Sequence, residues 1–130
     1  MNRIAGMRGL RVLIIEDNVD LALTTRALLA LHGHTVWIAA NGHQGLFLAR
    51  QVQPHAVLCD IGLPGITGYE VAQAFRRDEN LRAIHLIAVT AYGNEEDIYR
   101  GQQAGFEHHL VKPVEPDHLV RVLEQVTAAG

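Results

Sequence analysis

Five side chains that can act together in phosphate chemistry stand directly after apolar segments of the sequence. They are Glu16, Asp17, Asp60, Thr90 and Lys112. If those segments are parallel strands of one sheet, their carboxyl ends meet at one edge and the side chains gather there. Clustered carboxylates repel one another, and a divalent cation such as Mg²⁺ relieves that repulsion. Because a lysine and a hydroxyl are suited to phosphate oxygens, the set predicts a phosphoryl-transfer site.

Asp60 is the predicted nucleophile, because a carboxylate can attack phosphorus and form an aspartyl phosphate. It stands alone after its apolar segment, whereas Glu16 and Asp17 are adjacent and resemble a metal-binding pair. Taken singly, an acidic pair is often a helix cap, and a lone threonine or Lys-Pro pair is usually a cap or a turn. Four such features at four strand ends favour the functional interpretation.

Apolar and amphipathic segments alternate along the whole chain and indicate the elements that would position this site. The predicted strands are 10–15, 35–39, 55–59, 84–89 and 109–111. The predicted helices are 19–32, 44–53, 67–77, 95–104 and 115–127. Gly33 and Gly105 follow helices at positions where glycine is favoured. Five strand–helix pairs with short links predict an α/β fold with a parallel sheet covered on both faces.

The composition predicts one globular domain over residues 1–130, with a core from about 10 to 127 and loose ends. The 130 residues are 48% hydrophobic and 19% charged, which excludes a disordered tail. Eleven basic and fourteen acidic residues give a net charge of −3, which argues against direct nucleic-acid binding. A single cysteine, Cys59, and the lack of a long apolar segment favour a cytoplasmic location without membrane insertion.

The segments around the predicted site resemble the receiver domain of bacterial two-component response regulators. The matching motifs are residues 12–18, 60–70, 90–92 and 110–113. The resemblance covers about residues 10–126 and implies the flavodoxin-like, doubly wound strand order 2-1-3-4-5 of chemotaxis-regulator-like proteins. The stretch Gly62-Leu63-Pro64-Gly65 is similar to receivers that are fused to hybrid sensor kinases.

The resemblance implies a phosphorylation-dependent signalling switch. Asp60 would accept a phosphoryl group from a phosphohistidine of a histidine kinase or a histidine phosphotransfer protein. Asp17, Asp60 and the backbone carbonyl of Gly62 would ligate Mg²⁺, for which Mn²⁺ can substitute, and Glu16 would act through water. Such a domain is not an enzyme beyond catalysing its own phosphorylation and slow dephosphorylation.

The resemblance also assigns the residues that respond to phosphorylation. Lys112 would contact the phosphoryl oxygens, and Thr90 would move toward them. The Lys112–Pro113 bond is expected to be cis. Receivers usually carry Tyr or Phe three residues before the lysine, and that ring moves inward with the threonine. Here the residue is His109, so the aromatic part of the switch is in question.

Two other functions compete with the switch. One is a Mg²⁺-dependent aspartyl-phosphate phosphatase of the haloacid-dehalogenase type, which also uses strand-end Asp, Thr and Lys. That class carries a second Asp two residues after the nucleophile, whereas Asp60 is followed by Ile61 and Gly62. The other is an interaction module that is never phosphorylated, which the complete set of acids, Thr90 and Lys112 argues against.

Overall fold

The computed structural model describes residues 9–129, so most of the predicted loose ends, 1–9 and 128–130, lies outside the described residues. Five strands alternate with five helices. The strands are β1 (Arg11–Ile15), β2 (Thr35–Ala39), β3 (Ala56–Cys59), β4 (His85–Thr90) and β5 (His108–Val111). The helices are α1 (Val19–Leu31), α2 (Gly42–Val52), α3 (Gly68–Arg77), α4 (Glu95–Ala104) and α5 (Pro116–Ala129). All neighbouring strands are parallel in the order β2-β1-β3-β4-β5, which confirms the predicted fold.

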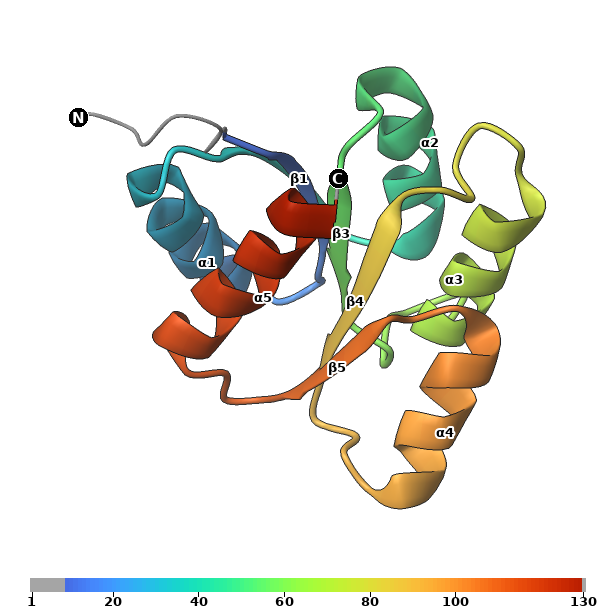
Figure 1. Cartoon of the computed structure of the whole chain (residues 1–130). Helices are drawn as coiled ribbons and strands as arrows, with labels where there is room; N and C mark the ends of the chain where they lie inside the picture. The colour runs from blue at the N-terminus through green and yellow to red at the C-terminus, as the bar shows by residue number, and fades with distance from the viewer. Residues whose placement is uncertain (1–8, 130) are drawn as a thin grey trace.

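The helices form one layer on each side of the sheet. Figure 1 shows α1 and α5 together on one side, and α2, α3 and α4 on the other. Each layer packs on its own cluster of buried side chains, one with Ala22 and Leu29 of α1 and the other with Phe75 of α3. This arrangement follows from crossover connections between parallel strands, which place helices on both faces.

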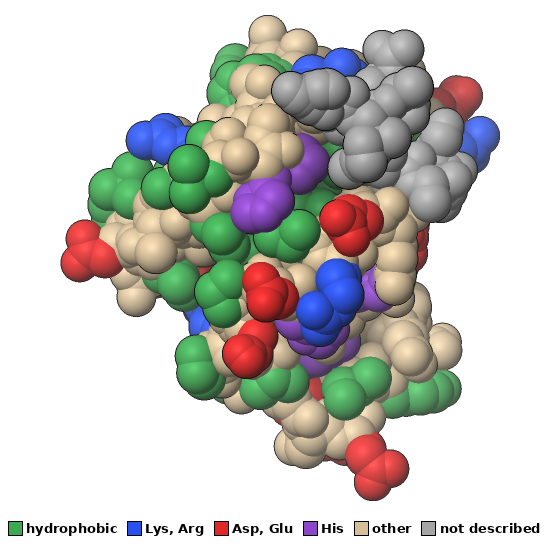
Figure 2. Space-filling view, turned by 60° about the vertical axis from the view of Figure 1, so that its left-hand side comes forward, with side chains coloured by type: hydrophobic (Ala, Val, Ile, Leu, Met, Phe, Trp, Pro, Cys, Tyr) green, Lys and Arg blue, Asp and Glu red, His purple; other side chains and the backbone are tan. Residues whose placement is uncertain are grey.

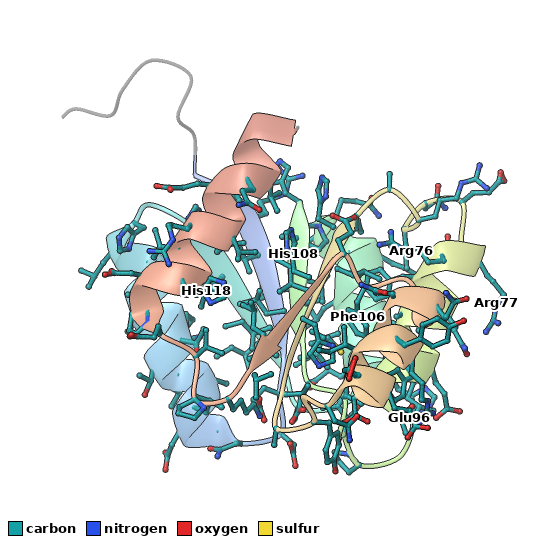
Figure 3. The ribbon with its side chains drawn as sticks, turned by 60° about the horizontal axis from the view of Figure 1, so that its bottom comes forward. Arg76, Arg77, Glu96, Phe106, His108 and His118 are labelled. Carbon is teal, nitrogen blue, oxygen red and sulfur yellow. The ribbon has the colours of Figure 1, made fainter. Side chains whose placement is uncertain are left out.

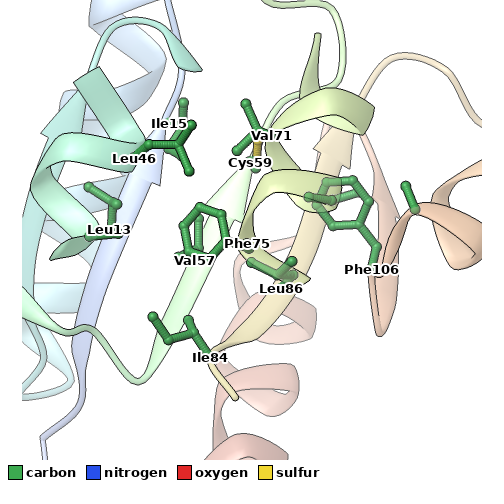
Figure 4. Packing of buried hydrophobic residues seen from close by; sticks show 14 of the residues in the cluster. Leu13, Ile15, Leu46, Val57, Cys59, Val71, Phe75, Ile84, Leu86 and Phe106 are labelled. Atoms are coloured by element: carbon green, nitrogen blue, oxygen red, sulfur yellow. The ribbon is translucent and has the colours of Figure 1, made fainter. Parts of the chain in front are cut away.

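The central strands are buried on both faces, which explains why their sequences are apolar without alternation. All four residues of β3 are buried, with Val57 and Cys59 facing one cluster and Ala56 and Leu58 the other. Figure 4 shows Val57, Cys59 and Leu86 packed around the ring of Phe75. The Cys59 thiol is free and fully enclosed, as expected for a packing residue.

Side-chain caps fix the starts of the helices, and one cap corrects a predicted boundary. The Asn41 side chain accepts a hydrogen bond from the Gln44 backbone N–H, so α2 begins at Gly42 rather than at 44. The Asn41-Gly42 pair reads as a turn in the sequence, but here it is a helix N-terminus. At α3, Thr67 and Glu70 form a reciprocal capping box.

Arg76 ties the end of α3 to the segments that lead into β4 and β5. Its guanidinium donates hydrogen bonds to the backbone carbonyls of Gly105, Arg82 and Ile84. In Figure 3 Arg76 lies beside the end of α4, close to Phe106. These contacts, together with an ion pair from Arg76 to Glu107, hold the entry to β5 in place.

The surface over α1 and α5 carries mixed charge. Figure 2 shows acidic, basic and histidine side chains interspersed with hydrophobic ones, and no single basic patch on the described part of this face. A mixed surface agrees with the net charge of −3. Among the described residues, none of the helices is both long and apolar enough to cross a membrane.

Candidate functional site

The strand register brings the predicted acidic residues together at the carboxyl edge of the sheet. Ile15 of β1 pairs with Cys59 of β3, so the residues that follow them, Glu16 and Asp60, lie side by side. One carboxylate oxygen from each of Glu16, Asp17 and Asp60 lies within 4.8 Å of the others. Glu16 and Asp60 are buried and Asp17 is exposed, so the cluster is open to solvent on one side.

Lys112 reaches this cluster from the end of β5, the strand at one border of the sheet. Thr90 pairs with Val111 at the ends of β4 and β5, so Lys112 is the next residue along the edge. Its Nζ lies 2.8 Å from Glu16 Oε1 and 3.1 Å from Asp60 Oδ2. One ammonium group thus contacts two carboxylates. The Lys112–Pro113 peptide bond that follows is cis, as predicted.

The electrostatics of the edge follow from burial and from these contacts. Burial raises the pKa of Glu16, and the nearby Asp60 charge adds to that effect, against the opposing hydrogen bonds from Lys112 and the Asn18 backbone N–H. For Lys112, burial acts to lower the pKa, but hydrogen bonds to Glu16 and Asp60 outweigh it and the pKa is raised. Lys112 is therefore a permanent cation beside the acids.

The donor set fits a hard divalent cation. All three side chains offer carboxylate oxygens, which Mg²⁺ prefers, and their spacing allows one ion to contact each of them. The single lysine offsets one negative charge of the three, so the described residues leave the cluster short of positive charge. The backbone carbonyl of Gly62 stays a predicted ligand. The Gly62 N–H donates to Asp60 Oδ1 at 3.2 Å and thereby orients that carboxylate.

Thr90 and Tyr92 connect the acidic edge to the loop between β4 and α4. Thr90 is fully buried, and its hydroxyl accepts a hydrogen bond of 3.2 Å from the Tyr92 backbone N–H. The Tyr92 ring lies over Gly62, where an added Cβ would come within 3.1 Å of the ring. Sequence reasoning assigned Tyr92 no role, and the only signal was its place two residues after Thr90.

His109 lies on the other side of the same loop. Its Nε2 donates a hydrogen bond of 2.6 Å to the backbone carbonyl of Tyr92. Its Nδ1 is buried and has no hydrogen-bond partner among the described residues. The ring fits against α4 because residue 101 is glycine, where an added Cβ would lie 3.2 Å from Nδ1. His109 is thus hydrogen-bonded to the loop that follows Thr90, and no described contact joins it to the acidic cluster.

Comparison with known proteins gives a consistent identification. Residues 12–124 match the family described as the response regulator receiver domain. Protein PilH of Pseudomonas aeruginosa is 36% identical over 118 residues, which cover 91% of this chain and 98% of PilH. The polar-differentiation response regulator DivK of Brucella anthropi is 34% identical over 113 residues, which cover 87% of this chain and 92% of DivK.

Solved structures show the same architecture. The chemotaxis response regulator CheY4 of Vibrio cholerae superposes with a TM-score of 0.85 at 25% identity, over 92% of this chain and 99% of CheY4. The receiver domain of a sensor histidine kinase from Pseudomonas aeruginosa has a TM-score of 0.85 at 32% identity, over 92% of this chain and 98% of that domain. That domain has a magnesium ion coordinated in its active site cleft.

Proposed function

Because this chain belongs to the response regulator receiver domain family and is a phosphorylation-dependent signalling switch, we propose that Asp60 is the residue that accepts the phosphoryl group. The observation that carries this proposal is the contact of Lys112 Nζ with Asp60 Oδ2 at 3.1 Å, beside Glu16 and Asp17. A lysine and an acidic pair around one carboxylate meet both needs of phosphoryl transfer, which are charge neutralisation and positioning.

The proposed donor is a phosphohistidine of a histidine kinase or a histidine phosphotransfer protein. An Asp60 carboxylate oxygen attacks phosphorus, the P–N bond breaks, and its electron pair goes to the imidazole nitrogen of the donor. Lys112 neutralises the phosphoryl oxygens, and the Gly62 N–H keeps the other Asp60 oxygen oriented. Mg²⁺, held by Asp17, Asp60 and the Gly62 carbonyl with Glu16 through water, would neutralise further charge on the phosphoryl group.

Phosphorylation would alter the loop after β4. The Thr90 hydroxyl now accepts a bond from the Tyr92 N–H, and turning it toward a phosphoryl oxygen redirects its interactions. Contacts of the phosphoryl group with Lys112 and Thr90 would then favour a second conformation of the α4–β5 region. A bound group shifts an equilibrium by the difference between its affinities for the two states. We place His109 in this response, as the residue that holds the Tyr92 carbonyl.

The family is a signalling domain rather than a classical enzyme. We propose that residues 1–130 act as one receiver domain in the cytoplasm, with self-dephosphorylation as its only turnover. A phosphatase of the haloacid-dehalogenase type is disfavoured because Ile61 and Gly62 follow Asp60, which leaves no general acid two residues on.

The test is covalent labelling with phosphoramidate, a small donor without a carbon chain. We expect the wild type to gain one phosphoryl group in the presence of Mg²⁺ and none in its absence, as read by intact-mass spectrometry. Asp60→Asn is expected to abolish the gain, and Asp117→Asn, which changes an exposed carboxylate of α5, is expected to keep it. Undiminished labelling of Asp60→Asn would contradict the assignment. Turnover of a phosphate ester would favour the phosphatase instead.

A further inference from the structure

A cavity of about 620 Å³ lies between α1 and α5 and extends to the acidic edge of the sheet. At one end it is lined by Glu16, Asp60 and Lys112. Its walls are mostly hydrocarbon, with Thr24 and Thr25 among the lining residues, and are formed mainly by Leu21, Leu28, Leu58, Val89, Val114 and Leu119. The volume falls within the range of ligand-binding cavities, which commonly combine apolar walls with a few polar groups.

The cavity ends at Asp60, the proposed nucleophile. A ligand that fills it would have an apolar body and, next to Lys112, an anionic group that the ammonium can neutralise. In the absence of a cation, Glu16 and Asp60 repel any anionic group at this end, including the carboxylate of a fatty acid. A phosphoryl group fits better than a carboxylate, because Mg²⁺ is typically bound by one or two protein carboxylates together with phosphate oxygens.

We propose that the cavity between α1 and α5 binds the hydrocarbon tail of an aliphatic acyl phosphate, and so allows such a molecule to phosphorylate Asp60 directly. This inference rests on the proposed function of Asp60. The phosphoryl group lies at the acidic edge, and the tail extends along Leu21, Leu28 and Leu119. Acyl phosphates with a longer apolar chain are therefore better donors for this chain than acetyl phosphate.

The reaction is balanced without any further reactant. An Asp60 oxygen forms a bond to phosphorus, and the bond from phosphorus to the acyl oxygen breaks. The electron pair of that bond leaves with the acyl group, which departs as a carboxylate. Straight-chain carboxylates have nearly the same basicity, so the chemical step is matched among them. Differences in rate then report binding of the tail, since uniform binding energy raises kcat/KM.

The magnitude follows from burial of methylene groups. Removing one methylene from water is worth a factor of about four in affinity. Butyryl phosphate has two more methylenes than acetyl phosphate, so we expect its second-order labelling rate to be higher by about fifteenfold. Hexanoyl phosphate is expected to be faster again.

The experiment measures labelling rates of the whole chain with acetyl, butyryl and hexanoyl phosphate, each divided by the rate with phosphoramidate. The blocking variant is Thr25→Phe, which puts a ring into the cavity from a half-buried position of α1. We expect it to remove the chain-length dependence. The control is Thr35→Phe, the same change at an exposed residue of β2, which is expected to retain that dependence.

The outcomes separate this inference from the function on which it rests. Equal relative rates for the three acyl phosphates in the wild type would overturn it while labelling by phosphoramidate upholds Asp60. A chain-length dependence that survives in Thr25→Phe would likewise overturn the assignment to this cavity. Loss of labelling by phosphoramidate in the wild type would instead overturn the proposed function.

Discussion

His109 and Tyr92 are joined by a hydrogen bond of 2.6 Å from the imidazole Nε2–H to the backbone carbonyl. Tyr92 also donates its own N–H to Thr90, so the same residue is held from both sides. An inward movement of the His109 ring would break the first bond, which contributes about 1 kcal/mol. The ring also carries Nδ1, which is buried and has no hydrogen-bond partner within residues 9–129. Loss of the bond to Tyr92 therefore opposes the movement, which costs an apolar ring no hydrogen bond.

We therefore expect His109→Tyr to strengthen the response to phosphorylation. Beryllofluoride, a mimic of the phosphoryl group, is expected to produce larger amide chemical-shift changes in α4, β5 and α5 of this variant than in the wild type. The control is His108→Tyr, since neighbouring residues of a strand point to opposite faces. Wild-type changes as large as those of His109→Tyr, at both pH 6 and pH 8, would contradict a weakened switch.

Magnesium is expected to stabilise the fold through the acidic cluster. A cation that binds the folded state alone raises stability by mass action, and at ten times its dissociation constant the gain is about 1.4 kcal/mol. For a domain of this size that is a rise in Tm of roughly 4–8 °C, measured by thermal unfolding. Asp17→Ala is expected to lose most of it and Asp20→Ala, an exposed control, none. Equal rises in wild type and Asp17→Ala would place the ion elsewhere.

Removal of Lys112 is expected to separate metal binding from the conformational response. Asp17 and Asp60 remain in Lys112→Ala, so the rise in Tm with Mg²⁺ is expected to persist. The contact that distinguishes the phosphorylated state is lost, so the chemical-shift changes caused by beryllofluoride are expected to shrink in β5 and α5. Changes of wild-type size would show that Lys112 has no part in the response.

His55 is expected to make the stability of the chain depend on pH. Its Nδ1 accepts a hydrogen bond from the Arg11 N–H at 2.9 Å. Burial lowers its pKa from the usual 6.5, and the positive charges of Arg11 and of His85 lower it further. The unfolded chain then binds more protons than the folded one, so the free energy of unfolding falls as the pH drops below 6.5.

Urea unfolding between pH 5 and pH 8 measures this dependence. His55→Gln keeps a hydrogen-bond acceptor but does not titrate, so a shallower decrease at acidic pH is expected. His43→Gln, at an exposed position of α2, is the matched control and is expected to retain the wild-type slope. An unchanged slope in His55→Gln would show that other groups produce the effect.

Much of the fold is predictable from the sequence because local signals agree with it. The strands β1 and β3 are short β-branched or apolar runs, and helix α4 was predicted with its observed bounds, Glu95–Ala104. The predicted start of α2, at residue 44, was wrong because Asn and Gly favour both turns and helix termini. Only the hydrogen bond from the Gln44 N–H to Asn41 distinguishes the two.

Part of the site, too, could be predicted from the sequence and part could not. Glu16, Asp60 and Lys112 could be brought together from sequence, since parallel strands place their ends at one edge. The bond from His109 to Tyr92 and the cavity between α1 and α5 could not. Both depend on how side chains from distant segments fill space, and no periodicity or motif encodes that packing.

The contact between Lys112 and Asp60 spans 52 positions of the chain. During synthesis, Asp60 leaves the ribosome well before the lysine that completes its surroundings. A chain that lacks β5 has no Lys112 beside Asp60, so its acidic edge is without the ammonium group that contacts Glu16 and Asp60. The electrostatic surroundings of Asp60 are therefore completed only when the last strand joins the sheet, and they depend on the fold as a whole.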